Sequence, residues 1–303
     1  MGKIYDVIIA GAGPAGMTAA IYAKRAELSA LLIDRNFMGG GQVLNTYEVD
    51  NYPGLPGING FDLGQKFSDH VDGMGCERIS EEIVSMELTG DTKKVITDQG
   101  EYLAKTVILA SGNSPKKLSV PGEEELSGMG VSYCATCDGA FFKGKITAVA
   151  GGGDVAVEDA IFLSRGCQKV YLIHRRDELR AQKSLQTALF NTENIEFIPD
   201  SVVKEIKGDG SVSSVIIENV KTGEISELSL DGIFVAIGNE PNASYIKDIE
   251  CDEKGYILAL EDCKTSIPGV FAAGDVRSKR LRQITTAVSD GANAITSVQE
   301  YLI

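Results

Sequence analysis

The chain has 303 residues, of which 43% are apolar and 24% are charged, and it contains 34 glycines. This length suffices for about two domains with separate cores, and the composition is that of a globular protein, not a disordered one. The net charge of −14 argues against nucleic acid or an anionic membrane as a partner, since both attract basic surfaces.

The chain shows no apolar signal-peptide core, and no run approaches the roughly 20 apolar residues of a membrane-spanning helix. Six cysteines, most of them isolated in the sequence, are typical of a reducing compartment. We therefore expect a cytoplasmic protein.

The first pattern is a strand, a glycine loop, a helix and a second strand. Residues 5–10 and 30–33 are apolar runs that predict buried strands, and a small-residue helix between them extends to about residue 26. The loop has G-x-G-x-x-G spacing and comprises Gly11, Ala12, Gly13, Pro14, Ala15 and Gly16. Such glycines let a pyrophosphate approach the backbone at a helix N-terminus, and Asp34, which precedes Arg35, can accept from a ribose hydroxyl. The order of these elements favours a dinucleotide site over a plain surface turn.

A C-x-x-C motif follows the strand predicted at residues 106–110 and the turn at 111–115. Cys134 and Cys137 can close a disulfide within one turn, and this spacing tends to lower a thiol pKa. Half of a zinc site and two inert thiols are the alternatives. Zinc normally takes four ligands, and the other cysteines and both histidines lack ligand spacing, so we expect no metal. Asp138 is either a proton donor to a thiolate or a turn or helix-cap carboxylate.

The strand, loop, helix and strand pattern recurs with one position changed. Strands are predicted at residues 145–150 and 169–173, with a helix to about residue 164. The second loop has Gly-x-Gly-x-x-Ala spacing and comprises Gly151, Gly152, Gly153, Asp154, Val155 and Ala156. His174 stands at the same distance from Gly151 as Asp34 does from Gly11.

The change of side chain at this position predicts the ligand. Arg175 and Arg176 follow His174, and Arg180 lies a turn further on. A 2′-phosphate is repelled by a carboxylate and pairs with guanidinium groups, so we expect this site to prefer NADPH to NADH. The alternative is a solvated run of charge.

The two units are connected by similar turns. The strand at residues 232–237 is followed by residues 238–241, and this exit and residues 112–115 both read Gly-Asn-x-Pro. We therefore expect an α/β fold with two Rossmann-like, three-layer dinucleotide-binding domains, the second inserted into the first. The first would comprise residues 1–115 and 242–303 and the second residues 116–241, with the two linkers forming a hinge.

The last segment predicts a strand over residues 265–275, which ends in Gly274 and Asp275. Asp275 can accept from a polyol hydroxyl. A helix that opens with Arg282, Gln283 and Ile284 and runs to about residue 302 can point its N-terminal amides at the pyrimidine end of a flavin. An ordinary strand, turn and helix is the alternative.

Taken together, these residues resemble the low-molecular-weight, NADPH-dependent thioredoxin reductases, which are flavin disulfide reductases, over essentially the whole chain. The motifs that carry the resemblance are residues 11–16, 40–42, 52–54, 134–138, 151–154, 174–181, 271–275 and 282–283. The resemblance implies thioredoxin-disulfide reductase activity. Electrons would pass from NADPH through FAD to a Cys134–Cys137 disulfide, and then to the disulfide of thioredoxin or a thioredoxin-like protein. It also implies a homodimer.

The resemblance assigns FAD to the first domain and NADPH, with the disulfide, to the second. The expected FAD contacts are Gly11, Gly13, Pro14, Ala15, Gly16, Asp34, Arg35, Gly41, Gln42, Asn51, Gly112, Gly274, Asp275, Arg282, Gln283 and Ile284. The expected NADPH contacts are Gly151, Gly152, Gly153, Asp154, Val155, Ala156, His174, Arg175, Arg176 and Arg180. Val155 departs from the small polar residue that the family commonly has, which predicts weaker but not abolished binding.

The catalytic group is expected to comprise Cys134, Cys137 and Asp138. We expect Cys137 to be the sulfur on the flavin side and the attacking thiolate, and Cys134 to be the resolving thiol, although the sequence does not separate these roles. Nicotinamide and disulfide would both need one flavin edge, so a rotation about the linkers is expected. A relative fed by ferredoxin or with another acceptor is an alternative, as is a redox sensor; the arginine cluster favours NADPH, and no output domain is recognisable.

Overall fold

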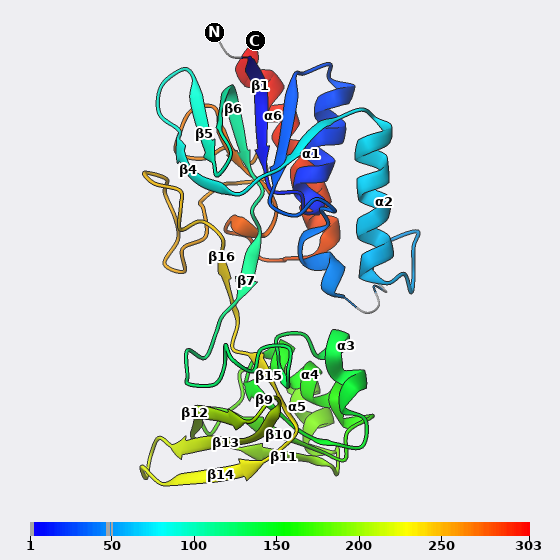
Figure 1. Ribbon diagram of the computed structural model, residues 1–303, viewed down its shortest axis with the longest axis vertical. Coiled ribbons are helices and arrows are strands. Elements are labelled where there is room, and N and C mark those ends of the chain that lie inside the picture. The colour runs from blue at the N-terminus through cyan, green and yellow to red at the C-terminus, as the bar shows by residue number, and fades with distance from the viewer. Residues whose placement is uncertain (1–2, 47–48, 50) are drawn as a thin grey trace. The chain divides into compact units, whose positions relative to one another are not determined.

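The computed structural model describes residues 3–46, 49 and 51–303, and the chain forms two compact units. The first comprises Met1–Ser114 and Glu240–Ile303, and the second comprises Pro115–Asn239 (Figure 1). Each is built on a largely parallel sheet with one helical face, which confirms the predicted α/β class. None of the helices in the described residues is long and apolar enough to span a bilayer.

The sheet of the first unit has the order β3-β2-β1-β6-β5-β4, and β17 also pairs with β6. Its parallel strands are β1 (Ile4–Ala10), β2 (Ala30–Asp34), β3 (Glu77–Ser80), β6 (Glu101–Leu109) and β17 (Val270–Ala272). The strands β4 (Ile83–Glu87) and β5 (Lys93–Thr97) continue it in antiparallel fashion.

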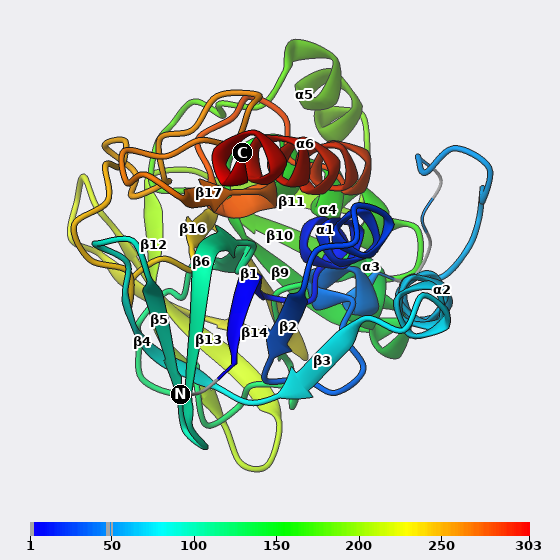
Figure 2. The same ribbon diagram turned by 90° about the horizontal axis from the view of Figure 1, so that it is seen from above.

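Alternation along the buried strands creates a core on each face of this sheet. Val7 and Ile9 of β1 pack with the helices, whereas Ile8 and Ala10 pack on the opposite face with β4, β5 and residues near Ile257. The helices are α1 (Pro14–Arg25), α2 (Gly60–Gly73) and α6 (Ile284–Leu302). Helices α1 and α6 are in contact and cover the same face (Figure 2). The loops at the carboxyl ends of β1 and β17 therefore meet at the starts of these helices.

The second unit repeats the plan with five parallel strands in the order β11-β10-β9-β15-β8. They are β8 (Val131–Ser132), β9 (Ile146–Gly151), β10 (Lys169–Ile173), β11 (Ile195–Ile198) and β15 (Gly232–Ala236). The helices α4 (Asp154–Ser164) and α5 (Lys183–Phe190) cover one face. The other face carries an antiparallel sheet of β12 (Ser201–Gly208), β13 (Val212–Asn219) and β14 (Ile225–Ser229).

Short elements complete the chain. They are the helix α3 (Ala135–Asp138), the 3-10 turns η1 (Gly41–Asn45), η2 (Gly139–Phe142) and η3 (Gly274–Val276), and the strands β7 (Asn113–Pro115) and β16 (Asn239–Pro241). The strands β7 and β16 pair with one another. Each follows a glycine in the left-handed region, Gly112 at φ 70° and Gly238 at φ 109°, which is why both exits require glycine.

The strand predicted over residues 265–275 was too long. Only Val270–Ala272 is a strand, and Gly274–Val276 forms a 3-10 turn. Gly269 has a φ of 75°, and the amide of Val270 donates to the carbonyl of Ile267, so a turn interrupts the apolar run. Ser266 and Pro268, before the turn, are exposed, whereas Val270–Ala272 are buried, so only the part after the turn has the burial of a central strand.

Candidate functional site

The first glycine loop joins β1 to α1. Two of its glycines are packed tightly against the backbone, and the third faces open space. A Cβ on Gly11 would lie 2.5 Å from the carbonyl oxygen of Ala110, and a Cβ on Gly16 would lie 1.8 Å from that of Gly11. Gly13 is the N-cap of α1, and a Cβ there would meet no protein atom within 4 Å. Two glycines thus permit the backbone packing, and the third leaves an open cradle at the helix N-terminus, which fits a pyrophosphate.

Asp34 ends β2 directly beside this loop. Its carboxylate accepts from the backbone amide of Ala12 at 2.7 Å and from that of Asn36 at 2.8 Å. A small pocket opens next to it, lined in part by Phe37 and Arg78. The Arg78 guanidinium lies 5.2 Å from the centre of the Phe37 ring. These two side chains were not predicted, because they come from a loop and from β3 and meet only in the fold. Arg35 is exposed and does not line the pocket.

Predicted FAD residues that are far apart in the sequence meet in this unit. The Nδ2 of Asn51 donates to Oε1 of Gln283 at 2.9 Å, and Gln283 caps α6 just before Ile284. Gln42 donates through Nε2 to Oδ1 of Asn113 at 2.6 Å. Asn113 is only 4% exposed and was missed by sequence reasoning, although it follows the predicted Gly112.

Asp275 and Arg282 lie on the turn between β17 and α6. Oδ1 of Asp275 is buried and has no hydrogen-bond partner among the described residues. Burial raises the pKa of this carboxyl, and the positive charges of Lys279 and Arg282 offset the effect only in part. Arg282 donates to the backbone carbonyl of Asp275 and stacks 3.7 Å from the ring centre of Tyr256. A buried acceptor without a donor fits a polyol hydroxyl.

The second glycine loop, between β9 and α4, has the same construction. A Cβ on Gly151 would lie 2.4 Å from the carbonyl oxygen of Ala236, whereas a Cβ on Gly153, the N-cap of α4, would meet no protein atom within 4 Å. Asp154 accepts from the amide of Gln182 at 2.7 Å. Ala156 is fully buried, and Val155 is 62% exposed.

His174 directly follows β10, lies beneath this loop and is only 5% exposed. A Cβ on Gly152 would lie 2.4 Å from its imidazole ring. Burial lowers the pKa of His174, and the charges of Arg180, Arg175 and Arg176 lower it further. The histidine is therefore a neutral support for the glycine loop, and the structure does not bring it into the pocket that the arginines line.

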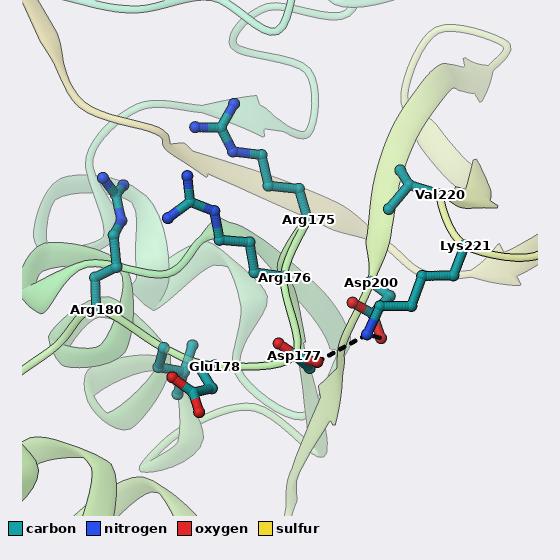
Figure 3. A pocket seen from close by; sticks show the side chains of 9 residues that line it. Arg175, Arg176, Asp177, Glu178, Arg180, Asp200, Val220 and Lys221 are labelled. Atoms are coloured by element: carbon teal, nitrogen blue, oxygen red, sulfur yellow. Dashed lines mark hydrogen bonds and ion pairs between the residues drawn. The ribbon is translucent and has the colours of Figure 1, made fainter.

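Arg175, Arg176 and Arg180 line an open pocket of about 300 Å³ (Figure 3). All three are exposed. The opposite wall includes Lys221, whose Nζ pairs with Asp177 at 2.7 Å and with Asp200 at 3.0 Å. Lys221 was not predicted because it lies on the turn after β13, far from the arginines in sequence. Asp177, Glu178 and Asp200 also line the pocket, and Lys221 neutralises two of these three acids. The three guanidinium groups therefore provide the positive charge that fits a phosphate monoester.

Cys134 and Cys137 form a disulfide, with their Cα atoms 5.3 Å apart. The pair therefore takes the form that the family resemblance implied, not a zinc half-site or two inert thiols. Cys134 is the N-cap of α3, and Asp138 is its last residue. Ser132, which sequence reasoning missed, donates through Oγ to Oδ2 of Asp138 at 2.6 Å and accepts from the Cys134 amide at 3.1 Å.

Comparison with known proteins agrees with this arrangement. Residues 5–291 match the family described as pyridine nucleotide-disulphide oxidoreductase. The chain is 48% identical to the thioredoxin reductase of Bacillus subtilis over 302 residues, which span 99% of this chain and 95% of that protein.

Solved structures give the same result. That of Lactococcus lactis thioredoxin reductase has a TM-score of 0.86 at 48% identity, with 98% of this chain and 99% of that chain covered. That of T. acidophilum thioredoxin reductase has a TM-score of 0.83 at 37% identity, with 99% of each chain covered. These matches confirm the family resemblance that the motifs indicated.

Proposed function

Because the chain belongs to the pyridine nucleotide-disulphide oxidoreductase family, we propose that it is an NADPH-dependent thioredoxin-disulfide reductase. The observation that carries the proposal is the Cys134–Cys137 disulfide, which lies in the same unit as the arginine pocket. Bound FAD would carry electrons from NADPH to this disulfide, which would then reduce thioredoxin or a thioredoxin-like protein.

FAD is assigned to the unit formed by Met1–Ser114 and Glu240–Ile303. The open cradle at Gly13 fits its pyrophosphate, the pocket beside Asp34 fits its adenosine, and the unpartnered Oδ1 of Asp275 fits a hydroxyl of its ribityl chain. The remaining contacts that we propose are Gly11, Pro14, Ala15, Gly16, Arg35, Gly41, Gln42, Asn51, Gly112, Gly274, Arg282, Gln283 and Ile284.

NADPH is assigned to the unit Pro115–Asn239. Gly153 offers the same open cradle, and Arg175, Arg176 and Arg180 line a pocket suited to the 2′-phosphate. The second loop contributes Gly151, Gly152, Asp154, Val155 and Ala156. This pocket favours NADPH over reduced ferredoxin as the electron donor, because a ferredoxin presents no isolated phosphate group.

The chemistry that bound FAD supplies is two-electron transfer between nicotinamide and a disulfide. In the dithiol form, the Cys137 thiolate attacks one sulfur of the acceptor disulfide, so that an S–S bond breaks and a mixed disulfide forms. The Cys134 thiolate then attacks the sulfur of Cys137, which restores the Cys134–Cys137 disulfide and releases the acceptor as a dithiol. Two electrons and two protons leave the chain, and Asp138 is the group beside Cys137 that gives or takes a proton.

The acceptor must reach the disulfide from solvent. Phe141 follows α3 and is 74% exposed, which is unusual for a large apolar side chain and fits a protein-binding surface beside the disulfide. We assign a homodimeric state and a cytoplasmic location to the protein. The family supports the first, and the four free cysteines support the second, since such thiols persist in a reducing compartment.

A turnover assay tests the proposal. Purified protein is mixed with thioredoxin and with insulin or another protein disulfide as the final acceptor. NADPH, NADH and reduced ferredoxin are then tested in separate reactions as the electron donor. We expect thiol release with NADPH that requires thioredoxin and is lost in C134S and C137S. Turnover with ferredoxin but not with NADPH would assign the chain to the alternative class of donor.

A further inference from the structure

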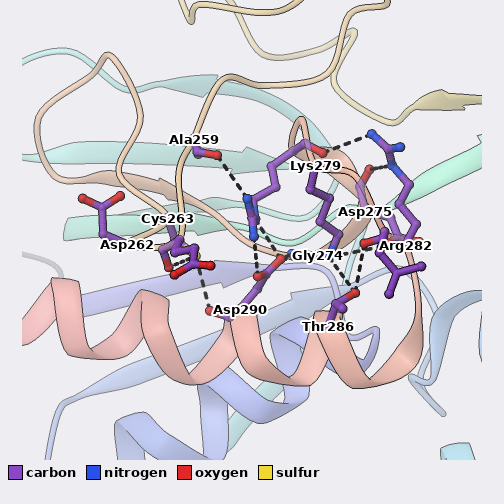
Figure 4. A network of polar contacts seen from close by, with 12 residues as sticks. Ala259, Asp262, Cys263, Gly274, Asp275, Lys279, Arg282, Thr286 and Asp290 are labelled. Carbon is purple, nitrogen blue, oxygen red and sulfur yellow. Dashed lines mark hydrogen bonds and ion pairs between the residues drawn. The ribbon is translucent and has the colours of Figure 1, made fainter.

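Four charged side chains form an ion cage beside the start of α6: Asp275, Arg277, Lys279 and Asp290 (Figure 4). The side chains of Arg277, Lys279 and Asp290 are 10%, 6% and 4% exposed, and that of Asp275 is 30% exposed. The cage holds two positive and two negative groups. Buried charges persist only when they are paired and hydrogen-bonded, so this balance is part of the fold.

Asp290, on α6, is the hub of the cage. Its carboxylate accepts from Nε and Nη2 of Arg277 at 2.9 and 2.7 Å, which is a bidentate pair. It also accepts from Nζ of Lys279 at 3.0 Å and from the backbone amide of Gly274 at 2.9 Å. Because Gly274 precedes Asp275, its hydrogen bond to Asp290 fixes the turn on which Asp275 lies.

The turn held in this way packs directly on the first turn of α1. Gly274 has a φ of 82°, and a Cβ on it would lie 2.9 Å from Cβ of Ala15. A Cβ on Gly291, next to Asp290, would lie 2.2 Å from the carbonyl oxygen of Ala15. Ala15 belongs to the first glycine loop. Asp290 therefore fixes Asp275 relative to the loop proposed to hold the pyrophosphate.

Lys279 links the hub to Asp275. Its Nζ lies 3.0 Å from the Asp290 carboxylate and 3.7 Å from Oδ1 of Asp275, the buried oxygen without a hydrogen-bond partner among the described residues. Together with Arg282, Lys279 supplies the positive charge that favours the carboxylate form of Asp275, which is the form that accepts.

We propose that Asp290, Arg277 and Lys279 are positioning residues for FAD, which set the place and the charge of Asp275 so that it accepts a hydroxyl of the ribityl chain. This inference rests on the proposed function, since it requires that the first unit binds FAD. None of the three need touch the flavin; they act through Gly274 and Asp275.

The charge balance of the ion cage decides which substitution tests the site without unfolding the chain. Asp290→Asn leaves two buried cations without their anion, so it tests the fold as much as the site. Lys279→Met removes the ammonium that pairs with both Asp290 and Asp275, but it leaves the bidentate Arg277–Asp290 pair complete, so the hub carboxylate keeps a buried cation. We therefore expect K279M to fold without FAD and to bind FAD more weakly.

The experiment measures FAD affinity of the full-length chain by quenching of flavin fluorescence on adding FAD to apoprotein. K279M is expected to raise the Kd for FAD about 10- to 100-fold, the range for loss of one charge-assisted contact. K279R should restore most of the affinity. The matched control is K264M. It removes an exposed lysine that pairs at 3.1 Å with Glu300 of α6, and it should leave the Kd for FAD unchanged.

A double-mutant cycle separates positioning from general support. If Lys279 acts through Asp275, K279M costs little further affinity in a D275N background. An unchanged Kd in K279M, an equal loss in the D275N background, or a K279M apoprotein that does not fold would each overturn the inference. Wild-type protein that binds no FAD would instead overturn the proposed function, so the two failures are distinct.

Discussion

Ser132 donates a 2.6 Å hydrogen bond to the carboxylate of Asp138, and the same hydroxyl accepts from the backbone amide of Cys134. The Ser132 side chain thus links Asp138, the proposed proton donor, to Cys134, the N-cap of α3. The link is local to the second unit, because Ser132 ends β8 and Asp138 ends α3. It gives Asp138 a fixed orientation at the disulfide.

The first prediction concerns this pair. D138N is expected to lower turnover with thioredoxin by about 10²- to 10⁴-fold, the usual contribution of a general acid or base, without changing FAD binding. S132A should give a smaller loss, because the carboxylate remains but loses its orientation. In a D138N background S132A should have almost no effect. Stopped-flow thiol release checks this, and additive losses from the two changes would show that they act separately.

The second prediction uses the two open glycines. G13A has a compatible φ of −76° and meets no protein atom, so the apoprotein should fold normally while the new methyl group fills the pyrophosphate cradle. We expect weaker FAD binding and an unchanged KM for NADPH. G153A, at φ −93°, should do the reverse. Each is the other's control, and the assignment of cofactors to units fails if both variants affect the same ligand.

G16A supplies the contrast to these changes. Its Cβ would lie 1.8 Å from the carbonyl oxygen of Gly11, so the helix and the loop cannot keep their packing. We expect loss of folded protein, not selective loss of one ligand, as measured by circular dichroism of the apoprotein. A well-folded G16A variant would contradict the close packing of this loop.

The third prediction concerns the arginine pocket. R175A and R176A should each raise the KM for NADPH about 10- to 100-fold, because charge-assisted hydrogen bonds to the 2′-phosphate are lost. Their KM for NADH should stay unchanged. An equal effect on both nucleotides would mean that the arginines do not read this phosphate.

Lys221 allows a sharper test of the same pocket. K221M leaves Asp177 and Asp200 uncompensated beside the phosphate site, so the KM for NADPH should rise. D177N in the same chain should reverse part of this loss by removing a negative charge. K169M, which breaks the surface pair between Lys169 and Glu196, is the control and should leave the KM for NADPH unchanged.

The fourth prediction is a pH dependence of stability. Burial and the nearby arginines lower the pKa of His174, so the unfolded chain binds the proton more readily than the folded one. Stability from this group is complete above the ordinary histidine pKa and is lost as the pH falls toward the lowered pKa. Denaturant unfolding of wild type and H174N at several pH values should show a smaller acid loss in H174N. H70N, which changes an exposed histidine, should retain the wild-type loss.

Local patterns predicted most of the fold and the ligand loops. The strand, glycine loop and helix units depend on neighbouring residues, and β10 (Lys169–Ile173) and the end of α4 at Ser164 were predicted at the observed positions. Positions that depend on packing between distant segments were not predicted. Ser132, Lys221 and Asp290 have no local signature, because each becomes informative only through a partner that the fold brings to it.

His174 shows what registration alone leaves open. Its sequence position matches that of Asp34, and this led us to group it with the arginines. The side chain instead packs against Gly152 and is buried, because the imidazole fills space beneath the glycine loop. The equal spacing of Asp34 and His174 from their glycine loops located the end of β10. It could not give the direction of the His174 side chain.

The most direct test of the central claim is an anaerobic titration of the FAD-loaded protein with NADPH, followed by the visible flavin band and by free thiols. We predict that the wild-type chain takes up one equivalent of NADPH for the flavin and a second for the Cys134–Cys137 disulfide, with two new thiols exposed. C137S should take up only the first and should not reduce thioredoxin. Equal NADPH uptake by wild type and C137S, or thioredoxin reduction by C137S, would contradict the account.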